Sequence, residues 1–118
     1  MTIYSHVKKD DFDNIIYKKD LRQHLREVAE GVDFCPPLPN ENDDFWLRNT
    51  SRIIGYCHDF GKYTSYFQEY LLKDKRRPPF HYHSYISSLW TYYILEKEKS
   101  NILNDCALTS DWAKYSSL

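Results

Sequence analysis

Long hydrophobic runs are missing from this sequence of 118 residues, and glycine occurs only three times. No stretch approaches the ~18 apolar residues of a membrane span. The first residues, MTIYSHVKKDD, lack the apolar core of a secretion signal. Alternation of apolar and polar residues, which would indicate half-buried strands, is not convincing in any segment. We therefore expect a helical protein without a membrane partner.

Cysteine is also scarce, and its spacing excludes two kinds of site. Cys35, Cys57 and Cys106 are widely separated and include no CxxC pair. An odd number of distant cysteines does not predict a disulfide framework, and without CxxC pairs a structural zinc site of that kind is not expected. Free thiols are typical of a reducing compartment, so we expect a cytoplasmic protein.

A dominant charge sign is lacking as well, because 16 basic residues are balanced by 17 acidic ones and the net charge is −1. This balance excludes a global attraction to nucleic acids, so any such contact must rest on a local patch. The only concentrated basic run comprises Lys73, Lys75, Arg76 and Arg77. Such runs are usually solvated surface. The alternative is that Lys75, Arg76 and Arg77 bind phosphates. Phe80 or Tyr82 would then stack on unpaired bases.

Helical periodicity dominates what is present in the sequence. Helices are expected from about Asp20 to Glu30, from Asp43 or Asp44 to near Phe60, over a short stretch from Ser65, from His83 or Ser84, and from Asn101. Apolar residues at helical spacing, such as Ile54 and Leu89, are expected to face the core. The sequence therefore predicts an all-α fold in one domain of residues 1–118.

His58 and Asp59 are adjacent near the end of the second expected helix. Imidazole and carboxylate are good ligands for borderline divalent metals, and neighbouring helical residues point only about 100° apart. His24 lies on the inward side of the first helix and His83 at the start of a later one, so three helices can converge here. An isolated His-Asp pair would more often be a helix end with a capping carboxylate.

The residues around this pair carry a resemblance to a known family. The strings are LRQHLREVA at 21–29, GYCHDFGKYTSYFQEYL at 55–71 and HSYISSLWTYYIL at 83–95, preceded by Tyr4-Ser5-His6. Their HD-x-G-K core resembles the signature of HD phosphohydrolases. In this order, the strings more narrowly resemble the HD nuclease of type I CRISPR systems, which accompanies or is fused to the CRISPR-associated helicase.

The resemblance implies an HD-type helical bundle that cuts single-stranded DNA in antiviral defence. It makes His24, His58, Asp59 and His83 metal ligands, with Asp59 and Lys62 as catalytic residues. The expected cofactors are divalent metal ions (Mn, Ni, Co or Fe, with Mg a further candidate). The expected partners are single-stranded DNA, the CRISPR-associated helicase and the effector complex.

Departures from the family pattern concern the second half of the expected domain. The pattern continues with a His-His pair and a later aspartate, whereas no histidine follows His83, and Asp105 and Asp111 lie in no matching motif. The chain is thus expected to represent the N-terminal part of such a domain, with C-terminal helices missing. It is expected to cleave little or no DNA alone and to expose an apolar edge along Ile86, Leu89 and Trp90. The alternatives are an HD enzyme acting on cyclic nucleotides and a non-catalytic binding module.

Overall fold

The computed structural model describes the backbone of residues 2–104 and the side chains of residues 2–99. Its elements are β1 (Tyr4–Lys9), β2 (Ile15–Asp20), α1 (Leu21–Glu30), the 3-10 helix η1 (Gly31–Phe34), α2 (Glu41–Cys57), the 3-10 helix η2 (Phe60–Tyr63), α3 (Ser65–Lys73) and α4 (Ser84–Asn104). The protein is thus mostly helical, as expected. The positions of Asp105, Cys106 and Asp111 lie outside the described residues.

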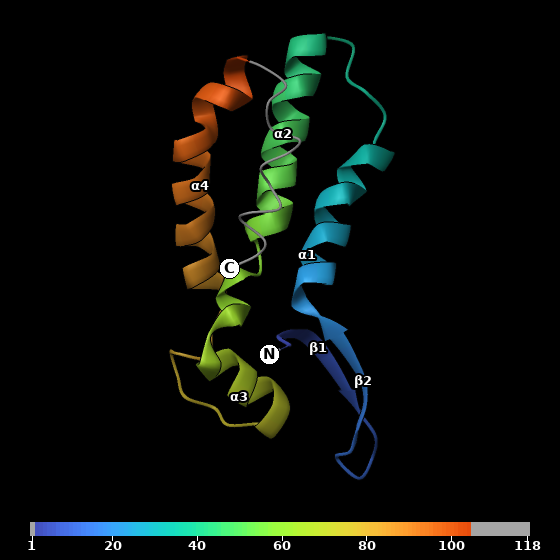
Figure 1. Ribbon diagram of the computed structural model, residues 1–118, viewed down its shortest axis with the longest axis vertical. Coiled ribbons are helices and arrows are strands. Elements are labelled where there is room, and N and C mark those ends of the chain that lie inside the picture. Colours follow the sequence, from blue (N-terminus) through green and yellow to red (C-terminus); the bar gives the residue numbers. More distant parts are fainter. Residues whose placement is uncertain (1, 105–118) are drawn as a thin grey trace.

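Three helices, α1, α2 and α4, run along the long axis of the molecule with α2 between the other two (Figure 1). The buried side chains that join them are Leu21, Leu25, Ala29, Ile53, Cys57 and Ile94. A Cβ added at Gly55 would lie 2.7 Å from the Cα of Ala29, so only glycine allows α1 and α2 to approach this closely. This contact brings the sides of the two helices that carry the site together.

The prediction of an all-α fold is wrong for the N-terminus, where β1 and β2 form an antiparallel hairpin. Val7, Ile15 and Tyr17 are residue types that favour strands, and Asp10 accepts hydrogen bonds from the backbone of the turn that joins them. The alternation was weak because the hairpin is largely solvated: Tyr17 is 53% exposed. A strand without one buried face has no reason to alternate.

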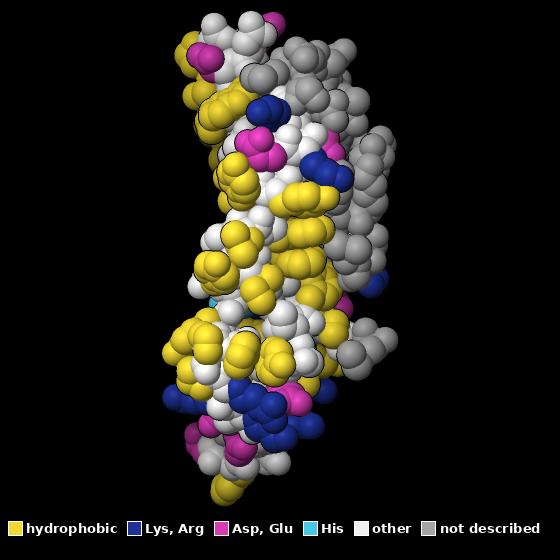
Figure 2. All heavy atoms as spheres, turned by 90° about the vertical axis from the view of Figure 1, so that its left-hand side faces the viewer, with side chains coloured by type: hydrophobic (Ala, Val, Ile, Leu, Met, Phe, Trp, Pro, Cys, Tyr) yellow, Lys and Arg dark blue, Asp and Glu magenta, His cyan; other side chains and the backbone are white. Residues whose placement is uncertain are grey.

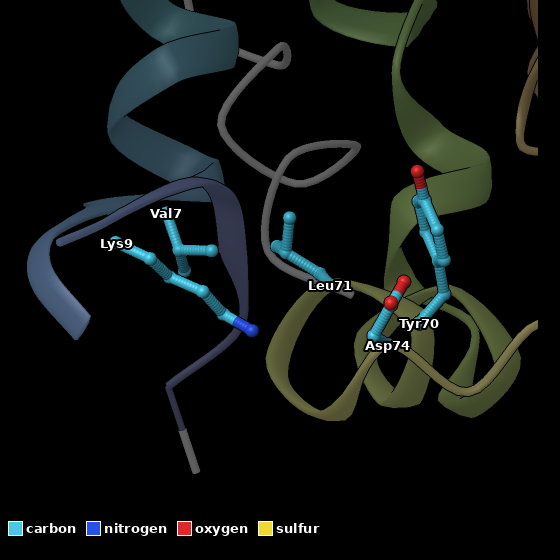
Figure 3. Close-up of a pocket in the computed structure, with 5 residues that line it drawn as sticks. All are labelled: Val7, Lys9, Tyr70, Leu71 and Asp74. Atoms are coloured by element: carbon cyan, nitrogen blue, oxygen red, sulfur yellow. The ribbon is translucent and has the colours of Figure 1, made fainter. Parts of the chain in front are cut away.

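The hairpin is fixed to the helices by the side chain of Gln68 on α3. Its Oε1 accepts from the backbone N–H of Tyr4 at 3.1 Å, and its Nε2 donates to the carbonyls of Tyr4 and Lys62, each at 2.8 Å. One amide thus joins β1, η2 and α3. An open pocket of about 270 Å³ lies nearby, with Val7 and Lys9 on the strand side and residues of the α3 end opposite (Figure 3).

The outward face of α4 is apolar, which agrees with the exposed edge expected along Ile86 and Leu89. Leu89 is 55% exposed and Tyr92 is 66% exposed, whereas Ile94 is fully buried. Ile54 on α2, expected in the core, is 45% exposed as well. Hydrophobic side chains consequently gather along this side of the molecule (Figure 2). No helix within residues 2–104 is long and apolar enough to cross a membrane.

Candidate metal centre

Asp59 lies where α2 ends and η2 begins, and its side chain is the centre of the site. Residue 59 is only 6% exposed, yet four charged or titratable groups surround its carboxylate. Its Oδ2 faces His24, His58 and Lys62, and its Oδ1 faces His83. All four residues that the sequence assigned to metal binding, and the lysine assigned to catalysis, therefore come together.

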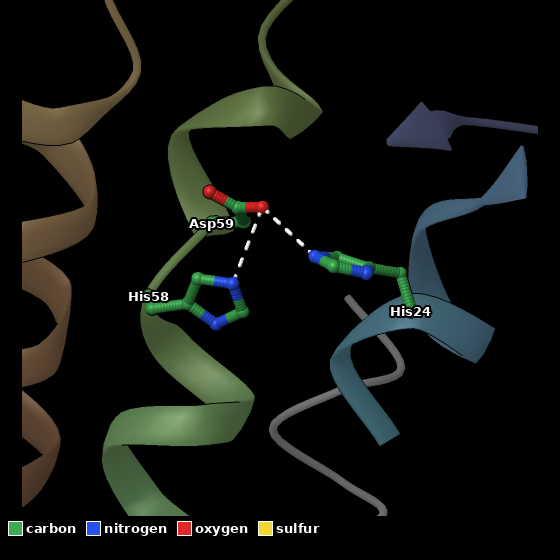
Figure 4. A group of neighbouring side chains, drawn as sticks. All are labelled: His24, His58 and Asp59. Carbon is green, nitrogen blue, oxygen red and sulfur yellow. Dashed lines mark hydrogen bonds and ion pairs between the residues drawn. The ribbon is translucent and has the colours of Figure 1, made fainter. Parts of the chain in front are cut away.

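His24 reaches this carboxylate from α1. Leu21 and Leu25 bury the inner face of the helix, which turns the imidazole between them toward α2. Asp20 caps the helix by accepting from the backbone N–H of Gln23. The Nε2 atom of His24 lies 3.1 Å from Oδ2 of Asp59 (Figure 4).

His58 caps the C-terminus of α2, and its ring is oriented by the helix itself. Its Nδ1 lies 2.7 Å from the carbonyl oxygen of Gly55. Since a carbonyl only accepts, Nδ1 carries the proton and donates it, which leaves Nε2 directed at Oδ2 of Asp59, 3.3 Å away. A backbone carbonyl that holds the second ring nitrogen is the usual support of a metal-binding histidine.

His83 precedes α4 and depends on close contact with η2. A Cβ added at Gly61 would lie 2.2 Å from the carbonyl oxygen of His83, so no other residue fits without displacing the backbone. Ser87 closes the contact, because its hydroxyl accepts from the backbone N–H of Gly61 at 2.9 Å and donates to the carbonyl of His83 at 2.8 Å. This packing places Nε2 of His83 3.1 Å from Oδ1 of Asp59.

Lys62 supplies a buried positive charge on the same side as His24 and His58. Its ammonium lies 2.8 Å from Oδ2 of Asp59 and donates to the carbonyl oxygen of Ser5 at 3.3 Å. The residue is 6% exposed, so this charge is screened little by solvent. Ser5, Gln68 and Ser87 lie within the quoted strings, but their contacts could not be predicted, because they join segments far apart in the sequence.

The pKa directions follow from burial and from these contacts. Burial by itself raises the pKa of the Asp59 carboxyl, but the hydrogen bonds from His58 and Lys62 and their charges outweigh it, so the pKa lies well below its usual value. The hydrogen bond to Asp59 raises the pKa of His58 against the effect of burial. Burial lowers the pKa of His24 and of His83. Asp59 is therefore ionised, and two of the imidazoles favour the neutral form that binds metals.

His24, His58 and Asp59 can hold a metal ion, because each offers one ligand atom and these atoms lie within 4.8 Å of one another. The fit is chemical as well as geometric: imidazole nitrogen and carboxylate oxygen suit the same divalent transition metals. His83 lies on the other carboxylate oxygen, so Asp59 is placed as a bridge between two sides of the site.

Of the remaining sequence candidates, only His6 lies against this cluster. Arg76 and Arg77 are exposed and form long ion pairs, at 3.6 Å with Asp74 and at 3.9 Å with Glu69. His81 is buried and its Nδ1 accepts from the backbone N–H of Arg77, so it is a structural residue of the loop. His6 and Lys75 are the last two candidates. The ring of His6 lies edge-on to that of His24, with centroids 5.0 Å apart, and Lys75 is exposed.

Comparisons with known proteins give this chain no relatives from which a function could be transferred. No protein-family model matches it, and neither a curated protein nor a solved structure shows significant similarity.

Proposed function

We propose that the protein is an HD-type, metal-dependent nuclease that cuts single-stranded DNA. The observation that carries this proposal is the convergence of His24, His58, His83 and Lys62 on the single carboxylate of Asp59. One cation is enough to neutralise a carboxylate. Three imidazoles in addition, brought from three separate helical segments, are better explained as ligands than as structural ion pairs.

The chemistry assigned to each side chain follows from its position. His24 and His58 would hold a cation at Oδ2 of Asp59, and His83 would hold one at Oδ1. When bound, such a cation supplies Lewis acidity to a phosphodiester and activates water for attack at phosphorus. Lys62 keeps a fixed positive charge at the edge of the cluster, where it can stabilise the negative charge that develops on the phosphate.

The ligand set favours some metals over others. Mg²⁺ and Ca²⁺ prefer oxygen ligands alone, whereas imidazole suits Fe and Ni, and the carboxylate of Asp59 suits Mn. We therefore propose a transition metal, with Mn²⁺ or Ni²⁺ as the first ions to test. The family strings around His24, Asp59 and His83 support the narrower proposal of a role in CRISPR defence, beside the CRISPR-associated helicase and the effector complex.

Metal binding tests the site directly. Isothermal calorimetry with Mn²⁺ should show binding by the unmodified protein, and at least tenfold weaker binding by Asp59→Asn, a loss of ~1.4 kcal/mol or more. Asp11→Ala is the matched control, because this carboxylate is exposed in the hairpin turn. Equal Mn²⁺ affinity in the unmodified protein and in Asp59→Asn would contradict the assignment.

Cleavage tests the reaction. With the protein in excess over labelled single-stranded DNA, slow cutting that requires Mn²⁺ and disappears in Asp59→Asn is the expected result. Excess protein is used because residues 1–118 alone are expected to cleave little or no DNA when the DNA is in excess. Cyclic dinucleotides are assayed in parallel. Hydrolysis of the cyclic substrate with no cutting of DNA would replace the nuclease by the alternative HD activity, and no Asp59-dependent hydrolysis of either would contradict both.

A further inference from the structure

A pocket of about 250 Å³ opens between α3 and the segment that leads into α4. Its lining residues are Phe67, Tyr70, His81, Tyr82, His83 and Ser84. His83 belongs both to this wall and to the Asp59 cluster, since its Nε2 lies 3.1 Å from Oδ1 of Asp59. A group bound in the pocket would therefore lie directly beside the candidate metal centre.

The walls of this pocket are aromatic, and several rings nearby face solvent. Tyr82 is 56% exposed and rests against His81, with ring centroids 4.3 Å apart. Phe80, two residues before Tyr82, is 58% exposed. Its ring stacks on that of Tyr66, with centroids 5.1 Å apart and an interplanar angle of 30°. Exposed flat rings held in place by neighbouring rings are suited to stacking on the bases of a single strand.

The pocket is small for a complete ligand. Sites for drug-sized molecules usually measure ~300–1,000 Å³. A volume of about 250 Å³ with aromatic walls has room for a flat ring system of nucleobase size, while the connected sugars and phosphates must pass over the surface outside.

Positive charge is available on the adjoining part of the loop. Lys75, Arg76 and Arg77 are all exposed. Arg76 pairs with Asp74 only at 3.6 Å, and both side chains are about two-thirds solvated, so the pair is weak and can exchange for a phosphate. Dark blue side chains accordingly lie next to yellow ones near the end of the molecule that carries α3 (Figure 2).

From this arrangement we infer that the pocket and the exposed rings of Phe80 and Tyr82 bind unpaired bases of single-stranded DNA. Lys75, Arg76 and Arg77 neutralise the neighbouring phosphates. The inference rests on the proposed function for its substrate, and it adds the surface that holds the strand while a phosphodiester lies at Asp59. Duplex DNA has no free base faces to offer this surface.

Binding is measured in EDTA, so that it does not depend on the metal centre. Fluorescence anisotropy with a labelled oligothymidylate should show roughly 5- to 150-fold weaker binding by Tyr82→Ala and by Phe80→Ala, the fold-change that loss of one stacked base produces. Tyr82→Phe keeps the ring and should bind nearly as well as the unmodified protein. Tyr17→Ala is the matched control, because Tyr17 is 53% exposed on β2 and should not matter.

Charge is tested with the triple variant Lys75→Ala, Arg76→Ala, Arg77→Ala. Its plot of log affinity against log salt should be flatter by roughly 0.7 for each lost phosphate contact. An unchanged slope, unchanged affinity in Tyr82→Ala and Phe80→Ala, or equal binding of duplex DNA or matching RNA would overturn the inference. Because Mn²⁺ calorimetry reports on the Asp59 cluster and DNA binding is measured in EDTA, failure of this surface and failure of the metal centre are separate results.

Discussion

Positively charged side chains lie in two contrasting regions, the Asp59 cluster and the loop after α3. Lys62 is buried and held between Asp59 and the carbonyl of Ser5, whereas Lys75 and its neighbours are solvated. A buried charge is costly without its partner, so Lys62 is tied to one geometry. A solvated charge contributes little to stability and stays free to meet a ligand. Lysine is therefore held in one geometry in the cluster, whereas in the loop it can be substituted with little effect on stability.

Removing the buried cation should have the largest effect on stability. Lys62→Met leaves the Asp59 carboxylate without its closest positive partner, and we expect the free energy of unfolding to fall by about 3 kcal/mol. The loss is no larger because the imidazoles still face the carboxylate. Urea unfolding without metal measures it. Lys75→Met is the matched control and should change stability by no more than ~0.5 kcal/mol. Similar losses in both variants would remove the contrast between the two regions.

Disturbing the contact between η2 and the start of α4 should have the next largest effect on stability. Gly61→Ala forces a Cβ against the carbonyl of His83 and should cost ~1–3 kcal/mol in thermal or urea unfolding. It should also weaken Mn²⁺ binding, because His83 must shift. Gly31→Ala is the control: a Cβ there meets nothing within 4 Å, and a stabilisation of ~0.4–1 kcal/mol is expected. Full Mn²⁺ affinity in Gly61→Ala would exclude His83 as a ligand.

Acid should weaken the stabilisation that the ionised carboxylate of Asp59 contributes to the fold. The pKa of Asp59 is lower in the folded protein than its ordinary value of 3.8, so its ionised form stabilises the fold above about pH 4. This stabilisation is lost as the pH falls through the folded pKa, by at most ~1.4 kcal/mol per pH unit. Urea unfolding between neutral and acid pH should therefore show the advantage over Asp59→Asn shrinking on the acid side. An advantage that grows with acid would reverse the assigned pKa direction.

Two thiols offer the mildest test of the difference between buried and exposed groups. Burial raises the pKa of Cys57 to about 12, whereas Cys35 is exposed. A thiolate is needed for alkylation, so iodoacetamide near neutral pH should label Cys35 quickly and Cys57 only after unfolding. Peptide mass spectrometry follows both. Rapid labelling of Cys57 in the folded protein would mean that α1, α2 and α4 open readily.

Sequence reasoning succeeded where local chemistry was sufficient. The bounds of α1 follow from Asp20 as its cap and from the spacing of Leu21 and Leu25, and the inward position of His24 follows with them. The hairpin was missed because its strands have no buried face. The outward position of Ile54 was missed because an apolar stripe does not state which side another helix covers. The contacts of Ser5 and Ser87 could not be predicted, although both residues lie in the quoted strings, since these contacts join elements far apart in the sequence.

The amide of Gln68 has a consequence for how the molecule moves. Because it bonds to the backbone of Tyr4 and of Lys62, departure of the first strand would break the contacts that join it to η2, the element that carries Lys62. Opening of the N-terminus and disassembly of the site should then be one cooperative event. Amide hydrogens of β1 and of η2 would exchange with solvent at the same rate, and a protease that trims the first strand would disturb the Asp59 cluster although His24, His58, Asp59 and His83 all lie beyond the cut.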